Sequence, residues 1–182
     1  MQLKKKFIKN GSEIEILFRE PKISDAKATM KFINSLVIEG AFIARTRPST
    51  LLEQKRNLKD IIKAIKENKE VRYFAFHNNK VIGFCGVSKE IYDVQTHLGN
   101  TGIMLEKNYR GIGLGKVIMN IVMEEAKRTL KMEIIKLTVF DTNKSAIKFY
   151  KNLGFLESGR IPRAFKQGNK YHAEITMYKE LK

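Results

Sequence analysis

Hydrophobic and polar positions along the chain follow two periods, one typical of strands and one typical of amphipathic helices. Residues 13–18 alternate and then become apolar, which predicts a first strand. Apolar positions then recur with the helical repeat over residues 24–36 and 50–68. Thr50 and Glu53 have the spacing of a capping box, so the second helix should begin there. Two helices are therefore expected between the first strand and the next.

Two runs rich in aromatic and β-branched residues follow, at 71–76 and 81–87, with the sequence His-Asn-Asn-Lys at 77–80 between them. Asparagine tolerates the positive φ angles of a tight turn, so these runs predict an antiparallel hairpin. Gly83 and Gly86 within the second run indicate a bulge or a close approach of neighbouring backbone.

The second half of the chain has the same mixed pattern. A strand is expected up to Leu105, then a glycine-rich turn and a strong amphipathic helix. A mostly apolar strand at 134–140 and a helix ended by Gly154 come next. Two strands between Phe155 and the C-terminus, joined by a connection at 162–169, complete the pattern. Because no repeat or linker divides these elements, the whole chain is expected to form a single α/β domain.

Composition places the chain among ordinary globular proteins. Its 182 residues are 43% hydrophobic and 30% charged. No apolar run approaches the roughly 20 residues of a transmembrane helix, and the lysine-rich N-terminus lacks the apolar run of a signal peptide. The single Cys85 can form no internal disulfide and excludes a cysteine-rich zinc module. We therefore expect a cytoplasmic protein without a membrane partner or a metal.

The formal net charge of +16 allows two interpretations. It could steer nucleic acid, an acidic protein or a polyanionic cofactor to the protein. Alternatively, lysines on helix faces keep the protein soluble, and this is favoured because lysine is scattered along the chain and interleaved with glutamate, as in residues 55–70. Residues 1–11, which contain Lys4-Lys5-Lys6, are expected to form a basic tail or a strand extension. Nucleic acid is not expected to be a substrate.

The stretch from Ile103 to Lys116 carries the most chemical information. A strand, a glycine-rich turn and a helix start would direct backbone N–H groups at an anion. A P-loop is excluded because Arg110 stands five residues before Gly115 and Val117 follows Lys116. A dinucleotide fingerprint would need glycine in place of Lys116. The remaining pattern is Arg-x-x-Gly-x-Gly, and from glycine content alone a turn without a ligand stays open.

Two motifs in this half of the chain resemble those of a known superfamily. The sequence Tyr-Arg-Gly-Ile-Gly-Leu-Gly at 109–115 resembles the acyl-coenzyme A pyrophosphate loop of the GNAT superfamily of N-acetyltransferases. Residues 143–155, Asn-Lys-Ser-Ala-Ile-Lys-Phe-Tyr-Lys-Asn-Leu-Gly-Phe, are similar to its second motif in order and spacing. The resemblance covers nearly the whole chain, least over 1–11 and 40–50. It implies an α/β fold with a mixed, mostly antiparallel central sheet of six to seven strands, flanked by helices and splayed at the central strand.

The resemblance also implies a site for acetyl-coenzyme A as a cosubstrate. Backbone N–H groups of the glycine-rich loop would hold the pyrophosphate, while the strand before the loop would pair its backbone with the pantetheine arm. Asn143 would contact the cofactor, although without the resemblance it reads as a helix cap, and Lys116 is as readily a solvated lysine. The residues implied in cofactor binding are Ile103, Met104, Leu105, Arg110, Gly111, Ile112, Gly113, Leu114, Gly115, Lys116, Asn143, Ser145 and Tyr150.

For catalysis, Tyr150 matches the general acid of the superfamily, because a phenol beside the sulfur can donate a proton to the departing thiolate. Alternatively, Tyr150 is a structural residue of the helix whose ring is buried in the core. Many relatives carry a glutamate on the central strand, whereas residues 97–102 here read His-Leu-Gly-Asn-Thr-Gly. His97 could serve as the base through a water held by Asn100, or be structural.

The sequence therefore predicts an N-acetyltransferase that transfers the acetyl group of acetyl-coenzyme A directly to a primary amine in a ternary complex. The identity of the acceptor amine stays open, from small molecules to protein amines, and so does a homodimer. In the superfamily the acceptor site is shaped by segments that correspond to residues 39–70 and 160–170. A non-catalytic coenzyme A sensor or a nucleic-acid-associated module is the alternative.

Overall fold

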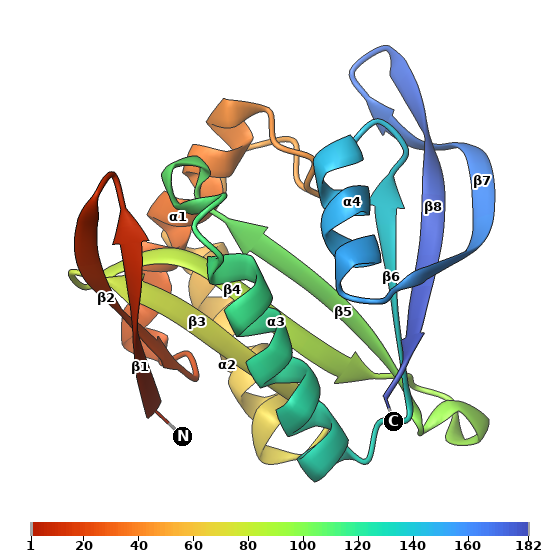
Figure 1. Cartoon of the computed structure of the whole chain (residues 1–182), viewed down its shortest axis with the longest axis horizontal. Coiled ribbons are helices and arrows are strands. Elements are labelled where there is room, and N and C mark those ends of the chain that lie inside the picture. The colour runs from red at the N-terminus through yellow and green to blue at the C-terminus, as the bar shows by residue number, and fades with distance from the viewer. Residues whose placement is uncertain (1, 182) are drawn as a thin grey trace.

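The computed structural model describes residues 2–181 and shows one sheet with helices on both faces (Figure 1). The eight strands lie in the order β1-β2-β3-β4-β5-β6-β8-β7. Their bounds are β1 (Gln2–Lys9), β2 (Ser12–Arg19), β3 (Glu70–His77), β4 (Lys80–Lys89), β5 (Leu98–Leu105), β6 (Ile134–Phe140), β7 (Leu156–Gln167) and β8 (Lys170–Glu180). The class of fold predicted from the sequence is confirmed, with one strand more than the six to seven expected.

The helices pack against the two faces of the sheet in pairs (Figure 1). Helices α1 (Ala26–Glu39) and α2 (Leu51–Lys66) cover one face, and α3 (Leu114–Glu125) and α4 (Lys144–Asn152) cover the other. The short helical turns are η1 (Ile23–Asp25), η2 (Asp93–Gln95), η3 (Lys107–Tyr109) and the π-helical η4 (Ala126–Leu130). Within residues 2–181, none of the helices has the length and apolar character needed to cross a membrane.

The sheet divides the hydrophobic core into two clusters. The larger lies under α3 and α4 and includes Cys85, Met119 and Tyr150. The smaller lies under α1 and α2 and includes Phe74 and Phe84. Because successive strand residues point to opposite faces, these clusters show which face each position of β4 and β5 presents. The two faces of the central strands therefore belong to two separate hydrophobic clusters.

The central strands separate from one another partway along their length. All neighbouring strands are antiparallel except β5 and β6, whose parallel ladder contains three pairs, from Leu98 with Ile134 to Asn100 with Lys136. The ladder between β5 and β4 continues to the pair of Leu105 with Gly83. Beyond Asn100, β5 stays with β4 and leaves β6, so the predicted splay at the central strand is confirmed.

The N-terminal lysine run is part of a strand rather than a tail. All eight residues of β1 pair with β2, so the expectation of a solvated tail is wrong and the strand extension describes this segment. Lys4 and Lys6 form ion pairs with Glu15 and Glu13 of β2 at 2.7 and 2.8 Å, while Phe7 is buried. Three consecutive lysines interrupt the alternation of apolar and polar residues that predicts a strand. Lys4 and Lys6 are paired with acidic residues of the neighbouring strand, which are not recognisable as partners from the lysine run itself.

The other local predictions agree with the structure at most positions. Residues 71–76 and 81–87 lie in the hairpin of β3 and β4, and the turn residues Asn78 and Asn79 have φ angles of 48° and 60°. Strand β7 continues to Gln167, so most of the connection expected at 162–169 is strand. The register shifts between Ile161 and Phe165, on either side of Pro162, which has no N–H to donate to a ladder.

Candidate active site

The glycine-rich loop turns into the start of α3 with a backbone geometry suited to an anion, and we call this loop the anion cradle. Gly111 and Gly113 have φ angles of 81° and 85°, values that residues with a side chain rarely adopt. The N–H of Val117 donates to the carbonyl of Gly113 at 3.2 Å and is the first to enter the ladder of α3. The N–H groups before it point out of the helix end, where the helix dipole also favours an anion. The loop therefore has the geometry predicted for a phosphate site.

Gly115 serves packing rather than backbone conformation. A β-carbon on Gly115 would lie 3.2 Å from Cε2 of Phe149 and 3.3 Å from Cδ1 of Leu105. The residue is buried where the first turn of α3 meets α4 and the end of β5. Because glycine has no side chain, α3, α4 and the end of β5 can pack closely together at this position.

The side chain of Arg110 is directed at the protein and not at the cradle. Its guanidinium forms a two-point ion pair with Glu39, at the end of α1, and its Nε and Nη2 donate to the carbonyl of Leu105 at 3.0 and 2.9 Å. Arg110 thus ties α1 to the end of β5. Glu39 was not predictable as a partner, because the two residues are 71 positions apart.

A second set of side chains supports the loop from the hairpin turns. The Tyr109 hydroxyl lies 2.8 Å from Nδ1 of His77, and Nζ of Lys9 lies 4.7 Å from the centre of the Tyr109 ring. Burial raises the pKa of Tyr109, so its hydroxyl keeps its proton. The sequence predicted a turn at His77 but not this contact, which joins segments 32 residues apart.

The residues predicted to line the pantetheine arm lie on β5 beyond the point where it leaves β6. Ile103 and Leu105 pack on the side of α3, whereas Met104 packs on the side of α1 and α2. Gly102 is exposed, and no atom within 4 Å would meet a β-carbon there. An open space therefore lies over the middle of β5, on the face that Met104 shares.

Tyr150 lies on α4 with its ring packed between aromatic neighbours. The ring centres of Phe149 and Phe155 are 5.3 and 5.7 Å away, and the residue is 6% exposed. Its hydroxyl makes no hydrogen bond to any residue between 2 and 181. Burial raises the pKa of Tyr150, and the nearby Cys85 thiol adds to the shift. The phenol therefore stays protonated and has no protein acceptor competing for its proton.

Asn143 and Ser145 form the cap of α4. Oδ1 of Asn143 accepts from the N–H of Ala146 at 3.2 Å and from the Ser145 hydroxyl at 3.1 Å. The helix cap proposed as the alternative for Asn143 is thus present. Contact of either residue with a cofactor stays a prediction, as does a role for Lys116, which is exposed.

The predicted base and water holder lie near the other end of β5. Nδ2 of Asn100 donates to Glu90, and Glu90 forms a 2.7 Å ion pair with Lys136 of β6. The hydrogen bond from Lys136 lowers the pKa of Glu90, so this carboxylate is a weak base. His97 precedes β5, its ring is exposed, and its carbonyl accepts from the N–H groups of Glu133 and Ile134. The structure therefore joins Asn100 to Glu90 at the start of the splay.

The two segments expected to shape an acceptor site meet at the end of β6. Phe42, from the connection between α1 and α2, lies 5.3 Å from Phe140 between ring centres. Phe140 stacks on Phe165 of β7 at 4.1 Å, and His172 of β8 lies edge-on to it at 5.7 Å. This aromatic cluster connects the α1–α2 connection to the β7–β8 hairpin.

A pocket of about 510 Å³ lies between the sheet and α1 and α2. It reaches β5 at Met104 and β4 at Phe84, on the open face of Gly102. We call it the α1–α2 pocket. Its lining residues are Thr29, Ile33, Ile43, Ala44, Arg45, Gln54, Asn57, Leu58, Asp60, Ile61, Arg72, Phe74, Phe84 and Met104.

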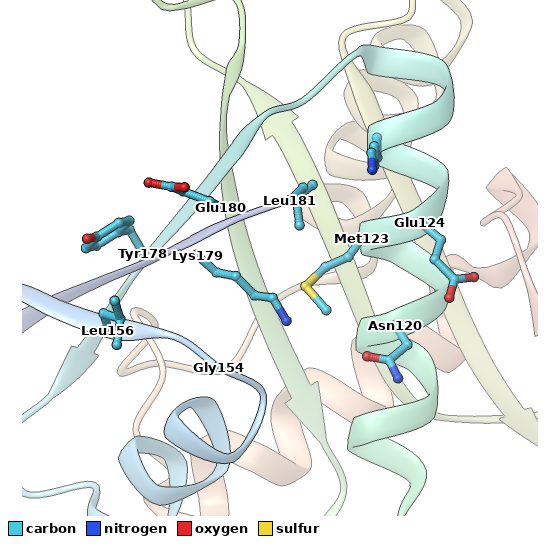
Figure 2. Close-up of a pocket in the computed structure, with 10 residues that line it drawn as sticks. Asn120, Met123, Glu124, Gly154, Leu156, Tyr178, Lys179, Glu180 and Leu181 are labelled. Carbon is cyan, nitrogen blue, oxygen red and sulfur yellow. The ribbon is translucent and has the colours of Figure 1, made fainter.

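A larger hollow of about 730 Å³ lies elsewhere, between the second half of α3 and the end of β8 (Figure 2). Figure 2 shows Met123 and Asn120 of α3 facing the Lys179 side chain, with Leu156 and Tyr178 beyond it. The Lys179 ammonium donates to the carbonyl of Leu153 at 2.5 Å. No residue predicted for the site lines this hollow.

The matching family model is described as the Acetyltransferase (GNAT) family and covers residues 40–155. A probable spermine N(1)-acetyltransferase of Bacillus subtilis subsp. natto (strain BEST195) is 26% identical over 126 residues, 64% of this chain and 77% of that protein. An L-amino acid N-acetyltransferase of Escherichia coli (strain K12) is 29% identical over 75 residues, 41% of this chain and 46% of its own.

Solved structures show the same fold. A putative acetyltransferase from Salmonella typhimurium, crystallised with its cofactor acetyl-CoA, superposes with a TM-score of 0.79 at 17% sequence identity. The match covers 92% of this chain and 94% of that one. The fold therefore extends well beyond the residues of the family model.

Proposed function

Since this chain belongs to the GNAT family of acetyltransferases, we propose that it transfers the acetyl group of acetyl-coenzyme A directly to a primary amine. The observation that carries the proposal is the position of the splay. Strand β5 leaves β6 after Asn100 and then runs directly into the anion cradle at the start of α3. A free strand edge that ends at a phosphate site suits a ligand with amide groups at one end and a pyrophosphate at the other.

The residues present fit coenzyme A in two respects. The backbone N–H groups between Gly111 and Lys116 suit the pyrophosphate, because they lie at a helix start and Gly111 and Gly113 add no side chain to the cradle. The edge of β5 from Ile103 to Leu105, facing away from β4, suits the amides of the pantetheine arm. Arg110 would act through Glu39 and Leu105 by holding the loop in place.

Tyr150 is proposed as the general acid. The reaction breaks the thioester C–S bond, forms an amide C–N bond, and leaves a proton from the amine and a thiolate that needs one. A buried phenol with no protein acceptor can supply that proton if its oxygen faces the sulfur. Burial raises the pKa of Tyr150 above its usual value of 10. The hydroxyl therefore stays protonated at any pH up to 10, and its ionisation should cause no loss of rate in that range.

The amine must lose its charge before it attacks. A lysine-like amine with a pKa of about 10.4 is only ~0.1% neutral at pH 7, so removal of its proton helps the reaction. We propose that Asn100 holds a water beside the open position of Gly102, and that a chain of waters leads from there to His97, the base before the start of β5. Glu90 orients Asn100 through its hydrogen bond.

The proposal is tested by the release of free thiol from acetyl-coenzyme A with a panel of primary amines. Thiol release should depend on the amine, and Tyr150→Phe should lower kcat by about 10²- to 10⁴-fold, the usual contribution of a general acid. Its affinity for coenzyme A should change little, because the ring that packs between Phe149 and Phe155 is kept.

Tyr171→Phe is the matched control, because Tyr171 is exposed on β8 and packs against Arg163 and Lys166. It should retain full activity. Tight binding of acetyl-coenzyme A without turnover on any amine would contradict the proposal and favour a coenzyme A sensor.

A further inference from the structure

The α1–α2 pocket indicates the class of amine. We propose that the acceptor is a free α-amino acid with an apolar side chain, bound in this pocket with its carboxylate on Arg72. The inference rests on the proposed function, since it assigns the substrate of that same site.

Arg72 lies beside the open part of β5 because a glycine stands between them. Arg72 of β3 pairs with Gly86 of β4, and Gly86 pairs with Gly102 of β5. A β-carbon on Gly86 would lie 3.1 Å from Nε and 3.2 Å from Cζ of Arg72. The guanidinium therefore lies over Gly86, on the same face as the open position of Gly102. A side chain at residue 86 would crowd the guanidinium, so the glycine favours this placement.

The free end of Arg72 is suited to a carboxylate. Its Nε donates to Glu70, a buried carboxylate that does not line the pocket. Its Nη1 and Nη2 donate to no other group in residues 2–181. Two parallel N–H donors of a guanidinium match the two oxygens of a carboxylate, which makes such a pair stronger and more directional than an ammonium contact.

Gln54 provides a second polar group without a partner. It is 4% exposed, lines the pocket from α2, and its amide makes no hydrogen bond within the described part of the chain. Its amide atoms are not among the enclosed polar atoms without a partner, so they face the open space of the pocket and can bond a polar ligand group there. An amide can donate to a carboxylate or accept from an amine, and an amino acid carries both.

The rest of the wall is suited to an apolar side chain. Eight of the fourteen lining residues are aliphatic, aromatic or methionine, supplied by both helices, the connection between them, and β3, β4 and β5. Their packing surfaces are Ile33, Ile43, Leu58, Ile61, Phe74, Phe84 and Met104. A volume of about 510 Å³ is in the usual range for small-molecule sites.

The balance of charge disfavours a polyamine. Of the described residues that line the pocket, only Asp60 carries a carboxylate, and Asp60 is exposed, whereas Arg45 and Arg72 are cationic. Glu53 and Glu70 pair with these arginines without lining the pocket. A ligand with several ammonium groups would meet like charges here, which costs affinity.

The spacing of the strands also fits an α-amino acid. Neighbouring strands lie about 4.8 Å apart, and the guanidinium of Arg72 covers the strand next to β5. An amine can reach the middle of β5 while its carboxylate stays on Arg72 only if the two groups are a few bonds apart. In an α-amino acid they are attached to the same carbon.

The inference is tested by comparing kcat/KM for leucine, leucinamide and spermidine with saturating acetyl-coenzyme A. Leucine should exceed both others by at least about tenfold, the scale of one lost charge-assisted contact. Leucinamide keeps the amine and the side chain and loses only the carboxylate. Its amine has the lower pKa and is more often neutral at pH 7, so its intrinsic reactivity works against the expected preference.

Two variants locate the effect. Arg72→Lys keeps the charge but loses the fork of donors, and it should raise the KM for leucine about tenfold with little change for leucinamide. Gln54→Leu should raise the KM for leucine independently and keeps the test possible if the Arg72 variant does not fold. Arg56→Lys, an exposed position of the same helix that does not line the pocket, should match the wild type.

Each outcome has a separate meaning. Spermidine as the best substrate, or equal use of leucine and leucinamide, would overturn the assignment while the proposed acetyl transfer stands. Absence of turnover with every amine would contradict the proposed function itself, and this inference with it.

Discussion

At the scale of single residues, glycines of this protein meet different physical demands. Gly113 has a φ of 85° and open space around it, so its backbone conformation is what requires glycine. Gly115 is required for steric reasons instead, because Phe149 and Leu105 would crowd any side chain at this position. Gly86 gives its space to the guanidinium of Arg72. The loop at the start of α3 and the α1–α2 pocket therefore both depend on positions that carry no side chain.

Gly115→Ala is predicted to weaken coenzyme A binding and to destabilise the fold. Overpacking costs about 1–3 kcal/mol, and the better helix propensity of alanine returns up to about 1 kcal/mol, so a net loss of about 1 kcal/mol is expected. Urea denaturation measures the stability and titration with coenzyme A measures the affinity. Gly159→Ala is the control, since a β-carbon there meets no atom within 4 Å. Equal affinity of the Gly115 variant and the wild type would contradict the packing role.

Residues of the site differ in how far the sequence could reveal them. Gly111 and Gly113 were predictable, because a local pattern of glycines states a local conformation. The partners of Arg110 and Tyr109 were not, since Glu39 and His77 are far away in the sequence and local pattern carries no trace of them. Arg72 was missed because an arginine within a strand normally signals an exposed position.

At the scale of elements, the connection between α1 and α2 is fastened at its end by α2. The Thr50 side chain accepts a hydrogen bond from the N–H of Glu53 at 3.2 Å, and the Glu53 carboxylate accepts one from the N–H of Thr50 at 2.9 Å. This confirms the capping box predicted from the sequence. Glu53 also pairs with Arg45 and Arg47, so the cap of α2 and the wall of the α1–α2 pocket share one carboxylate.

Thr50→Ala is predicted to lower the free energy of unfolding by about 1 kcal/mol, the usual value of a helix cap. It should also raise the KM of the acceptor while leaving the affinity for coenzyme A unchanged, because Arg45 loses a fixed partner. Ser35→Ala is the control, since its hydroxyl bonds only a carbonyl of its own helix. A change in coenzyme A affinity equal to the change in acceptor KM would contradict this division of roles.

Elements themselves were predicted better than their ends and their neighbours. The hairpin of β3 and β4 and helices α2, α3 and α4 follow from period and turn chemistry. Strand β1 was missed as a strand of the core sheet because its lysines are balanced by Glu13 and Glu15 on the next strand. The length of β7 was underestimated because Pro162 reads as a break, whereas the sheet edge absorbs it as an irregularity.

At the scale of the whole molecule, the sheet brings two compartments to one opening. The anion cradle lies at the start of α3, and the α1–α2 pocket lies on the opposite face. The ladder between β5 and β6 ends after Asn100, and under the proposed function the ligands of the two faces meet beyond that point. Lys4, Lys6, Lys63, Lys69, Lys80 and Lys136 form ion pairs with acidic side chains, while the excess of 35 lysines and arginines over 19 acidic residues leaves the net charge of +16.

The most direct test of acetyl transfer is mass spectrometry of the acceptor after incubation with acetyl-coenzyme A carrying heavy carbon in its acetyl group. We predict that leucine gains one labelled acetyl group on its nitrogen, with one free thiol released for each product formed. If no amine tested gains the label, whether the thioester is hydrolysed or stays intact, the proposed acetyl transfer is contradicted.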